Sequence, residues 1–407
     1  MPPWLPCRKK LTTVGENRSN TEQKTEEPPS PIDYFVRGDF VAILDRLGIS
    51  LVLSTRPNHI VFLGAADGQL TFSATPMIQP LGVAAEPGRI AVATVRSVAI
   101  FANVARLAPH YPGRLNYYDA FFAPRTIHFT GDCHMHDMIF ADNALIGANT
   151  NFSCVCRIDG VHSFTPLWIP SFITKLRAED RCHLNGFAAE AGQLRYVTAL
   201  SAADIPSGWR DLPDSSGILI DAKANAIMRS DLCMPHSPRL FDGELYVLNG
   251  GQGELLRIDR SNGRSTVVTA LPGFTHGLAA CAGILFVGMS QDRVSRKKEP
   301  PPIAAQATTM VAGVAAIDMK SGKILGGLDF TNGVTEVYDV QTLPGIRRAA
   351  MQSVLAADGY VAVDTPNAAF WSKRSVGALH HVQDIAGFGD YRIKVEKISP
   401  PPDDEAR

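Results

Sequence analysis

Four histidines stand at corresponding places in a repeated pattern of the chain. His136, His183, His236 and His276 each open a hydrophobic stretch that leads through a turn into a second strand-like segment. Neutral imidazoles that converge from several repeats can bind one divalent metal ion, such as iron, zinc or copper, through their ring nitrogens. A structural interpretation competes with this one, because histidines that begin strands also hold neighbouring repeats together by hydrogen bonds.

Two carboxylates and one guanidinium accompany the histidines. Glu336 and Asp339 belong to a sixth repeat opening, in which a carboxylate replaces the histidine. Either one could complete a set of three histidines and one carboxylate, or act as a general base. Arg239 follows His236 by three positions and could bind an anionic group of a substrate. Zinc would activate a bound water and iron would permit oxygen chemistry, which indicates a lyase, hydrolase or oxygenase acting on a small molecule or peptide.

Cysteines also recur near the histidines. Cys133, Cys182 and Cys233 lie three, one and three positions before His136, His183 and His236. A thiol nucleophile paired with a histidine therefore stays open. Neighbouring side chains on a strand point to opposite faces, which disfavours a direct pair between Cys182 and His183.

The elements that carry these residues are short strands in a long-period repeat. The repeat openings advance from Gly82 through the four histidines to Glu336, in steps of 40–60 residues. Each opening precedes further strand patterns and turns, which is typical of a β-propeller blade. We therefore predict an all-β fold, a propeller of six blades, with five or seven as the alternatives, whose first strands line the central channel. The strands at 50–74 lack an inner strand, so we expect the opening at Glu336 to join them in one composite blade.

Composition divides the chain into three parts. Residues 1–32 are polar and predict a disordered tail, 33–365 the propeller domain, and 366–407 a partly disordered C-terminal extension. One short amphipathic helix is expected over 39–47. Two long connections, 201–216 with Trp209 and Arg210, and the basic 291–309, could contact a substrate or a protein partner.

Charge and hydropathy indicate which classes of partner the protein can bind. The chain has 39 Lys and Arg against 40 Asp and Glu, a formal net charge of −1, and 45% hydrophobic residues. This balance lacks the basic face that nucleic-acid binding requires. No apolar run reaches the length of a membrane helix, and the N-terminus lacks the order of a secretory signal. We therefore expect a cytoplasmic protein without nucleic-acid or membrane partners.

Several runs resemble a known family. They are Arg181-Cys-His-Leu-Asn-Gly, Met234-Pro-His-Ser-Pro-Arg, Leu271-Pro-Gly-Phe-Thr and Tyr338-Asp-Val-Gln-Thr-Leu-Pro-Gly. In order, they are similar to an uncharacterised bacterial family, a conserved domain of unknown function with propeller-like strands, over about residues 39–350. The resemblance implies the fold and no activity. The family pattern has arginine where this chain has His276, which makes the other three histidines the better ligand set.

Two functional hypotheses follow from the sequence. The first is a propeller enzyme with a divalent metal at the channel mouth, bound by His136, His183 and His236, with His276 as a weaker ligand candidate. The second is a non-catalytic propeller whose polar ring is structural and whose loops bind a protein or a glycan. Bound metal would distinguish the first hypothesis from the second.

Overall fold

The computed structural model describes residues 32–141, 144–291, 301–306, 309–354 and 359–373. The predicted N-terminal tail lies outside this range except for its last residue, and so does most of the 291–309 connection. Within the described residues, no helix is both long enough and apolar enough to span a membrane.

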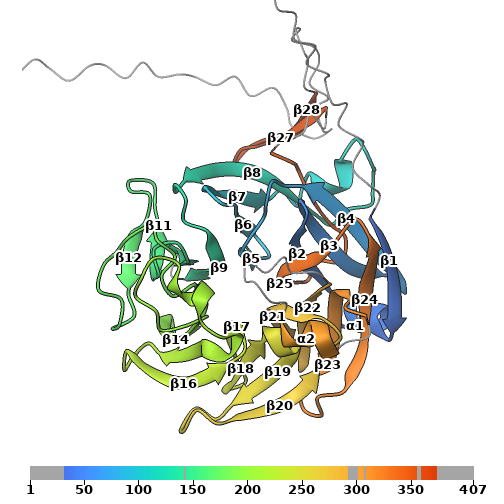
Figure 1. Ribbon diagram of the computed structural model, residues 1–407. Helices are drawn as coiled ribbons and strands as arrows, with labels where there is room; N and C mark the ends of the chain where they lie inside the picture. Colours follow the sequence, from blue (N-terminus) through green and yellow to red (C-terminus); the bar gives the residue numbers. More distant parts are fainter. Residues whose placement is uncertain (1–31, 142–143, 292–300, 307–308, 355–358, 374–407) are drawn as a thin grey trace, which may run out of the picture.

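Six antiparallel sheets surround a central axis, which confirms the predicted six-bladed β-propeller (Figure 1). We number the blades from the composite one. The inner strands of blades 1 to 6 are, in order, β25 (Glu336–Pro344), β5 (Val83–Glu86), β9 (Met135–Ala141), β13 (Leu184–Glu190), β17 (Pro235–Phe241) and β21 (Phe274–Cys281). The second strands are β2 (Ile49–Arg56), β6 (Arg89–Ala93), β10 (Ala144–Asn149), β14 (Gln193–Ala199), β18 (Glu244–Asn249) and β22 (Ile284–Ser290).

The outer half of each blade follows the same order. The third strands are β3 (His59–Ala66), β7 (Ser97–Asn103), β11 (Cys154–Ile158), β15 (Gly217–Asp221), β19 (Glu254–Ile258) and β23 (Ala312–Asp318). The fourth strands are β4 (Gln69–Pro76), β8 (Ala120–Phe129), β12 (Thr165–Trp168), β16 (Ala226–Leu232), β20 (Ser265–Ala270) and β24 (Ile324–Asn332). Asp67 and Gly68, which join β3 to β4, both have positive φ, as a tight two-residue hairpin turn requires.

The ring closes as the sequence predicts. β25, from the C-terminal part of the chain, pairs with β2 over its whole length, and Glu336 lies opposite Arg56. Blade 1 is therefore composite, with the strand order β25-β2-β3-β4. Closure in this way pairs the sheet edges that an open arc would expose.

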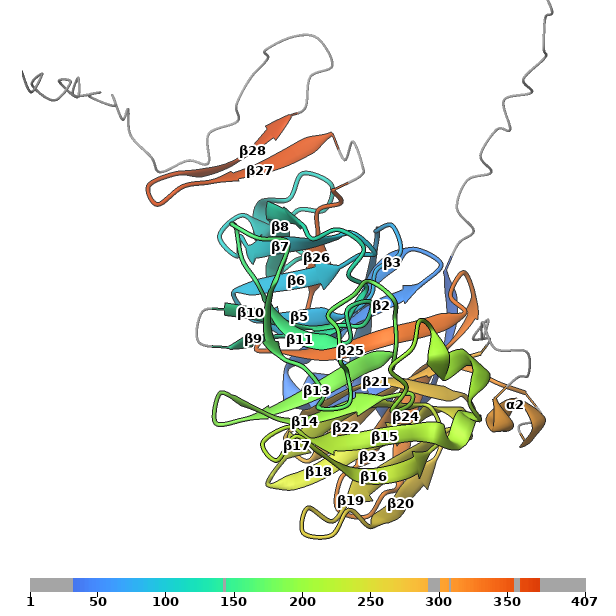
Figure 2. The same ribbon diagram turned by 60° about the vertical axis from the view of Figure 1, so that its left-hand side comes forward.

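Two blades carry a fifth, outermost strand. β1 (Asp33–Gly38) pairs antiparallel with β24, and β26 (Ala349–Met351) pairs parallel with β8. A hairpin of β27 (Tyr360–Asp364) and β28 (Ala369–Lys373) follows and lies beyond β8, outside the ring (Figures 1 and 2). The predicted domain boundary at residue 365 falls inside this hairpin.

Helical segments are few and lie in the connections between strands. The predicted helix is α1 (Phe40–Leu47), which ends at Gly48 with φ 63°. Phe40, Ile43 and Leu44 are its buried residues, and the buried cluster that contains them also holds strand residues of blades 1 and 6. The others are α2 (Pro302–Gln306) and the 3₁₀ turns η1 (Ala108–His110), η2 (Gly208–Asp211), η3 (Asp214–Ser216) and η4 (Gly250–Gln252).

Candidate functional site

Irregular pairing marks the start of the inner strands. In blades 1, 3, 4, 5 and 6 the register shifts within a few residues of the candidate histidines or of Tyr338. A β-bulge bends a strand and re-aims its side chains. These shifts therefore explain how two consecutive residues of one inner strand can both face the channel.

The hairpin register corrects one assignment from the sequence. Counting back from the turn at the end of each inner strand aligns His136 with His236 and His276, and with Asn185 in blade 4. His183 lies two residues earlier and is equivalent to His134, and both residues have φ 53°. The prediction that His183 occupies the same repeat position was therefore wrong, because the connection before β13 supplies it.

His183 nevertheless lies beside the others. Its ring centroid is 4.9 Å from that of His136, and the His236 and His276 centroids are 4.3 Å apart. Tyr338 joins the two pairs, at 5.4 Å from His136 and 4.5 Å from His276. We call these five residues the histidine mouth. They come from the entry ends of inner strands in blades 1, 3, 5 and 6 and from the loop that leads into blade 4.

Backbone carbonyls fix the tautomer of three imidazoles. His136 Nδ1 lies 2.8 Å from the carbonyl oxygen of His134, and His236 Nδ1 lies 2.8 Å from that of Met234. His276 Nδ1 contacts the carbonyl oxygen of Tyr338. A carbonyl can only accept, so each Nδ1 donates, and in the neutral ring the lone pair lies on Nε2.

The fourth imidazole is oriented by a carboxylate. His183 Nδ1 lies 2.9 Å from Asp180 Oδ1, and the indole nitrogen of Trp209 donates to Asp180 Oδ2 at 2.9 Å. The Trp209 ring lies 4.3 Å from the His183 ring, and the Arg210 guanidinium lies over Trp209 at 4.2 Å. The 201–216 connection therefore reaches the histidine mouth through Trp209.

Burial differs within the histidine mouth. His236 and His276 are 0% and 3% exposed, whereas His136 is 8% exposed. In the part of the chain that the structure describes, no group of three or more His, Cys, Asp or Glu side chains is placed to hold a metal ion. The imidazoles are neighbours in a chain of ring contacts and do not surround one point.

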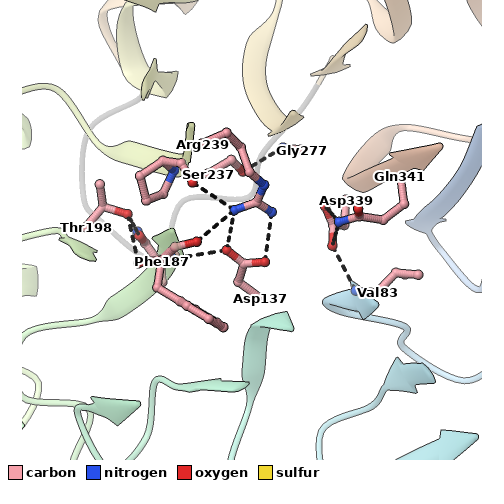
Figure 3. Close-up of polar contacts among 12 residues, drawn as sticks. Val83, Asp137, Phe187, Thr198, Ser237, Arg239, Gly277, Asp339 and Gln341 are labelled. Carbon is pink, nitrogen blue, oxygen red and sulfur yellow. Dashed lines mark hydrogen bonds and ion pairs between the residues drawn. The ribbon is translucent and has the colours of Figure 1, made fainter. Parts of the chain in front are cut away.

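A second ring lies one residue after the histidine position of each blade, within the inner strand or, in blade 2, directly before it. It alternates glycine with a polar residue, in the order Gly82, Asp137, Gly186, Ser237, Gly277 and Asp339 from blade 2 round to blade 1, and we call it the latch ring. Each polar member accepts a backbone N–H of the next blade. The distances are 3.1 Å from Phe187 N to Asp137, 3.1 Å from Gly277 N to Ser237, and 2.8 Å from Val83 N to Asp339 (Figure 3).

The glycines allow neighbouring blades to approach closely. A Cβ on Gly82 would lie 2.8 Å from the backbone nitrogen of Asp137, and one on Gly186 would lie 2.9 Å from that of Ser237. Such distances are shorter than van der Waals contact, so a side chain there would push the inner strands apart. The inner strands therefore carry polar residues at these positions because those residues form hydrogen bonds between neighbouring blades.

An ion pair lies within the latch ring. Arg239 Nη1 and Nη2 donate to Asp137 at 2.7 and 2.8 Å, and Nη1 also contacts the carbonyl oxygens of Phe187 and Pro238 at 3.0 Å (Figure 3). The guanidinium therefore makes its hydrogen bonds within the protein itself. Its contacts do not support the anion-binding role predicted from the sequence.

Asp339 is the second buried carboxylate of this layer. Burial, followed by the nearby charge of Asp137, raises the pKa of Asp339 to about 7, although Arg239 opposes the shift. Its Oδ1 accepts the N–H of Val340 at 2.8 Å, in addition to the contact with Val83. Asp339 is thus held in place by backbone amides below the histidine mouth.

Glu336 has a different position. It begins β25, and Arg56 Nε lies 4.0 Å from Glu336 Oε2. The Arg56 guanidinium also lies 5.7 Å from the centre of the Tyr338 ring. Tyr338 lies at the register shift between Val337 and Asp339, so Glu336 is related to it only through Arg56, which contacts both side chains.

The cysteines are buried structural residues. Cys133, Cys182 and Cys233 occupy equivalent positions, one residue before His134, His183 and Met234. Burial raises the pKa of Cys133 to about 11 and that of Cys182 to about 12. Because the thiolate is the nucleophile, these shifts oppose a catalytic thiol.

Sequence reasoning missed four residues of the site: Tyr338, Asp180, Trp209 as a partner of His183, and Arg56. Tyr338 carried a usable signal, since it stands in a repeat opening beside Asp339. The other three are brought to the histidine mouth by a strand end and by loops, for which no periodicity exists.

Comparison with solved structures identifies the fold. The nidogen/laminin complex contains a chain that matches with a TM-score of 0.50 at 12% identity, covering 73% of this chain and 99% of that one. A protein of unknown function from Bacteroides caccae matches with a TM-score of 0.45 at 13% identity, covering 72% and 98%. No curated protein sequence matches the chain.

The family is shown by sequence. Residues 38–352 match the family described as Domain of unknown function (DUF4915), a span close to the 39–350 over which the resemblance was noted. The match covers all six blades and the histidine mouth. The chain therefore belongs to the DUF4915 family.

Proposed function

We propose that the histidine mouth binds one divalent metal ion and that the protein is a metal-dependent enzyme acting on a small molecule. The single observation that supports this proposal is the fixed tautomer of three imidazoles. His136, His236 and His276 each donate Nδ1–H to a backbone carbonyl, so Nε2 is the nitrogen that can bind a metal. Ligating histidines in metal sites are oriented in this way through their second nitrogen.

Metal binding requires the Nε2 atoms to turn towards one point. The ring centroids of neighbouring members of the histidine mouth are 4.3 to 5.4 Å apart, and turning of the rings about their terminal side-chain bonds is a soft motion. His183, which Asp180 orients, is available as a fourth ligand. Three or four imidazoles favour zinc, copper or iron over magnesium or calcium, which prefer oxygen ligands.

In this proposal Glu336 acts as the general base. It begins β25, at the entry end of blade 1, and its side chain is 14% exposed, whereas Asp339 is 2% exposed and accepts two backbone amides. A base must reach the proton that it removes, which favours the more exposed residue. Zinc at this place would supply an activated water, and copper or iron would supply redox chemistry.

Metal content tests the proposal directly. We expect about one equivalent of zinc, iron or copper per chain by elemental mass spectrometry. Little should remain in a His136→Ala/His236→Ala/His276→Ala variant. The matched control is His110→Ala/His128→Ala/His162→Ala, which removes three histidines outside the site. Single His→Gln variants, checked by circular dichroism, distinguish lost ligation from lost folding.

The opposite result favours the non-catalytic alternative. The latch ring already gives the polar inner strands a structural role, through Asp137, Ser237 and Asp339. If the parent binds no metal after reconstitution with each ion, the proposal fails. The propeller is then better explained as a binding platform for a protein or a glycan.

A further inference from the structure

We propose that Arg56 is the anion-recognising residue of the histidine mouth, and that the ligand is a small molecule with a carboxylate or phosphate group. This inference deepens the proposed function and rests on it for the metal, but it concerns a different residue. It replaces Arg239, which the sequence indicated for the same role.

Arg56 occupies the right position. It is the last residue of β2 and lies opposite Glu336, the first residue of β25, at the entry end of blade 1. Its guanidinium lies 5.7 Å from the centre of the Tyr338 ring, which in turn contacts His136 and His276. A group bound to Arg56 would therefore lie near Tyr338, one ring away from His136 and His276.

The Arg56 guanidinium is weakly paired within the described residues. Its side chain is 30% exposed, and its ion pair with Glu336 is long, at 4.0 Å. Arg56 Nε is buried and has no hydrogen-bond partner among these residues. Arg239, by contrast, makes four hydrogen bonds. A buried donor without an acceptor is costly, and a bidentate oxyanion would supply one.

With a metal bound, the charge around the histidine mouth would favour an anion. Arg210 brings a second guanidinium on the far side, where it lies over Trp209 and 3.6 Å from Asp180. Glu336 and Asp180 balance the two arginines. Neutral imidazoles would leave the charge of a bound metal uncompensated, so an anionic substrate completes the balance.

Burial restricts the size of the ligand. His236 and His276 are almost fully buried, and Tyr338 is 3% exposed. A macromolecular surface cannot reach these rings, whereas the Arg56 side chain is 30% exposed. The inferred ligand is therefore a small molecule that places its oxyanion on Arg56 and its reacting group over the imidazoles.

Isothermal titration calorimetry of the full chain with succinate and with inorganic phosphate tests the inference. Uncharged succinamide serves as the control ligand. We expect at least one of the two anions to bind, and the Arg56→Gln variant to have an affinity about tenfold or more lower than the parent. The Arg56→Lys variant should lose less affinity than Arg56→Gln because lysine keeps the positive charge. Arg96→Gln removes an exposed, ion-paired arginine elsewhere and should leave affinity within about twofold.

The outcomes separate this inference from the proposed function. If succinate binds more strongly, the group that Arg56 recognises is a carboxylate. If inorganic phosphate binds more strongly, that group is a phosphate. No binding of either anion, or equal affinity for Arg56→Gln and the parent, overturns the inference. Metal content is measured on the same samples. If the anion binds through Arg56 and the protein holds no metal, only the metal proposal is contradicted. If the protein holds metal and the anion does not bind through Arg56, only this inference is contradicted.

Discussion

Arg239 of blade 5 and Asp137 of blade 3 form a bidentate ion pair that spans the inner strand of blade 4. Between them lies Phe187, whose N–H donates to Asp137 and whose carbonyl accepts from Arg239. The backbone N–H and C=O of this one residue of blade 4 are thus both bound by the ion pair. The pair fixes three consecutive blades around the channel, and its members are almost completely buried, with side chains 11% and 4% exposed.

Breaking this pair should destabilise the propeller strongly. Arg239→Gln leaves Asp137 buried without its counter-charge, and loss of one partner of a buried pair costs about 3–5 kcal/mol. Urea denaturation of the variant and the parent measures the difference. Arg96→Gln, at an exposed pair, should cost less than about 1 kcal/mol. A cost for Arg239→Gln no greater than that of Arg96→Gln would contradict the structural role.

The close approach at Gly82 gives a matched pair of variants. In Gly82→Ala the new Cβ would lie 2.8 Å from Asp137 N, whereas at Gly88 nothing lies within 4 Å. Overpacking of this kind costs about 1–3 kcal/mol. We therefore expect Gly82→Ala to lower the free energy of unfolding by that amount and Gly88→Ala to leave it almost unchanged. Equal effects would show that the latch ring tolerates an added methyl group.

The raised pKa of Asp339 predicts a pH dependence of stability. Its pKa is about 7 in the fold, because of burial and the Asp137 charge, against an ordinary value of 3.8. The folded state therefore holds more protons than the unfolded state between these values. The contribution of Asp339 is complete below about pH 4 and is lost as pH rises towards 7.

Replacement of Asp339 isolates this effect. Asp339→Asn cannot ionise, so its free energy of unfolding should fall less than that of the parent between pH 4 and pH 7. Arg239 and Asp137 remain in both proteins, and their contributions largely cancel in the comparison. Denaturation curves at one-unit steps of pH measure the two slopes. Parallel slopes would mean that Asp339 titrates as an ordinary carboxyl group.

Asp180 links Trp209 to His183, which predicts a looser 201–216 connection without it. Asp180→Ala removes the acceptor of the Trp209 indole N–H and of His183 Nδ1. We expect faster cleavage of this connection by a protease and a shift of the Trp209 emission. Asp231→Ala changes a 70% exposed carboxylate on an outer strand and should leave both unchanged. An unaltered cleavage rate for Asp180→Ala would show that other contacts hold the loop.

The sequence predicted the architecture because the blade is a repeated unit. The spacing from Gly82 to Glu336 indicated six blades, and the unmatched strands at 50–74 predicted the composite blade that β25 completes. Both depend on patterns that recur along the chain. β26 could not be predicted in this way, because its three residues pair in parallel with β8, far away in sequence.

The candidate site was only partly predictable. His136, His236 and His276 share one register, but His183 comes two residues early, and only the hairpin pairing of β13 shows this. The pairing of Arg239 with Asp137 depends on two strands 102 residues apart. Arg56 and Trp209 reach the histidine mouth from a strand end and a loop. Sequence periodicity and repeat spacing do not indicate where the side chains of such residues point.

X-ray absorption spectroscopy of the metal-loaded protein is the decisive test of metal binding by the histidine mouth, because it identifies the atoms around the metal. We expect nitrogen donors with imidazole scattering, at about 2.0–2.1 Å if the metal is zinc, and fewer imidazoles in His236→Gln. The His162→Gln control should leave the spectrum unchanged. Oxygen donors alone, or the same spectrum in His236→Gln and the parent, would show that the histidine mouth does not hold the metal.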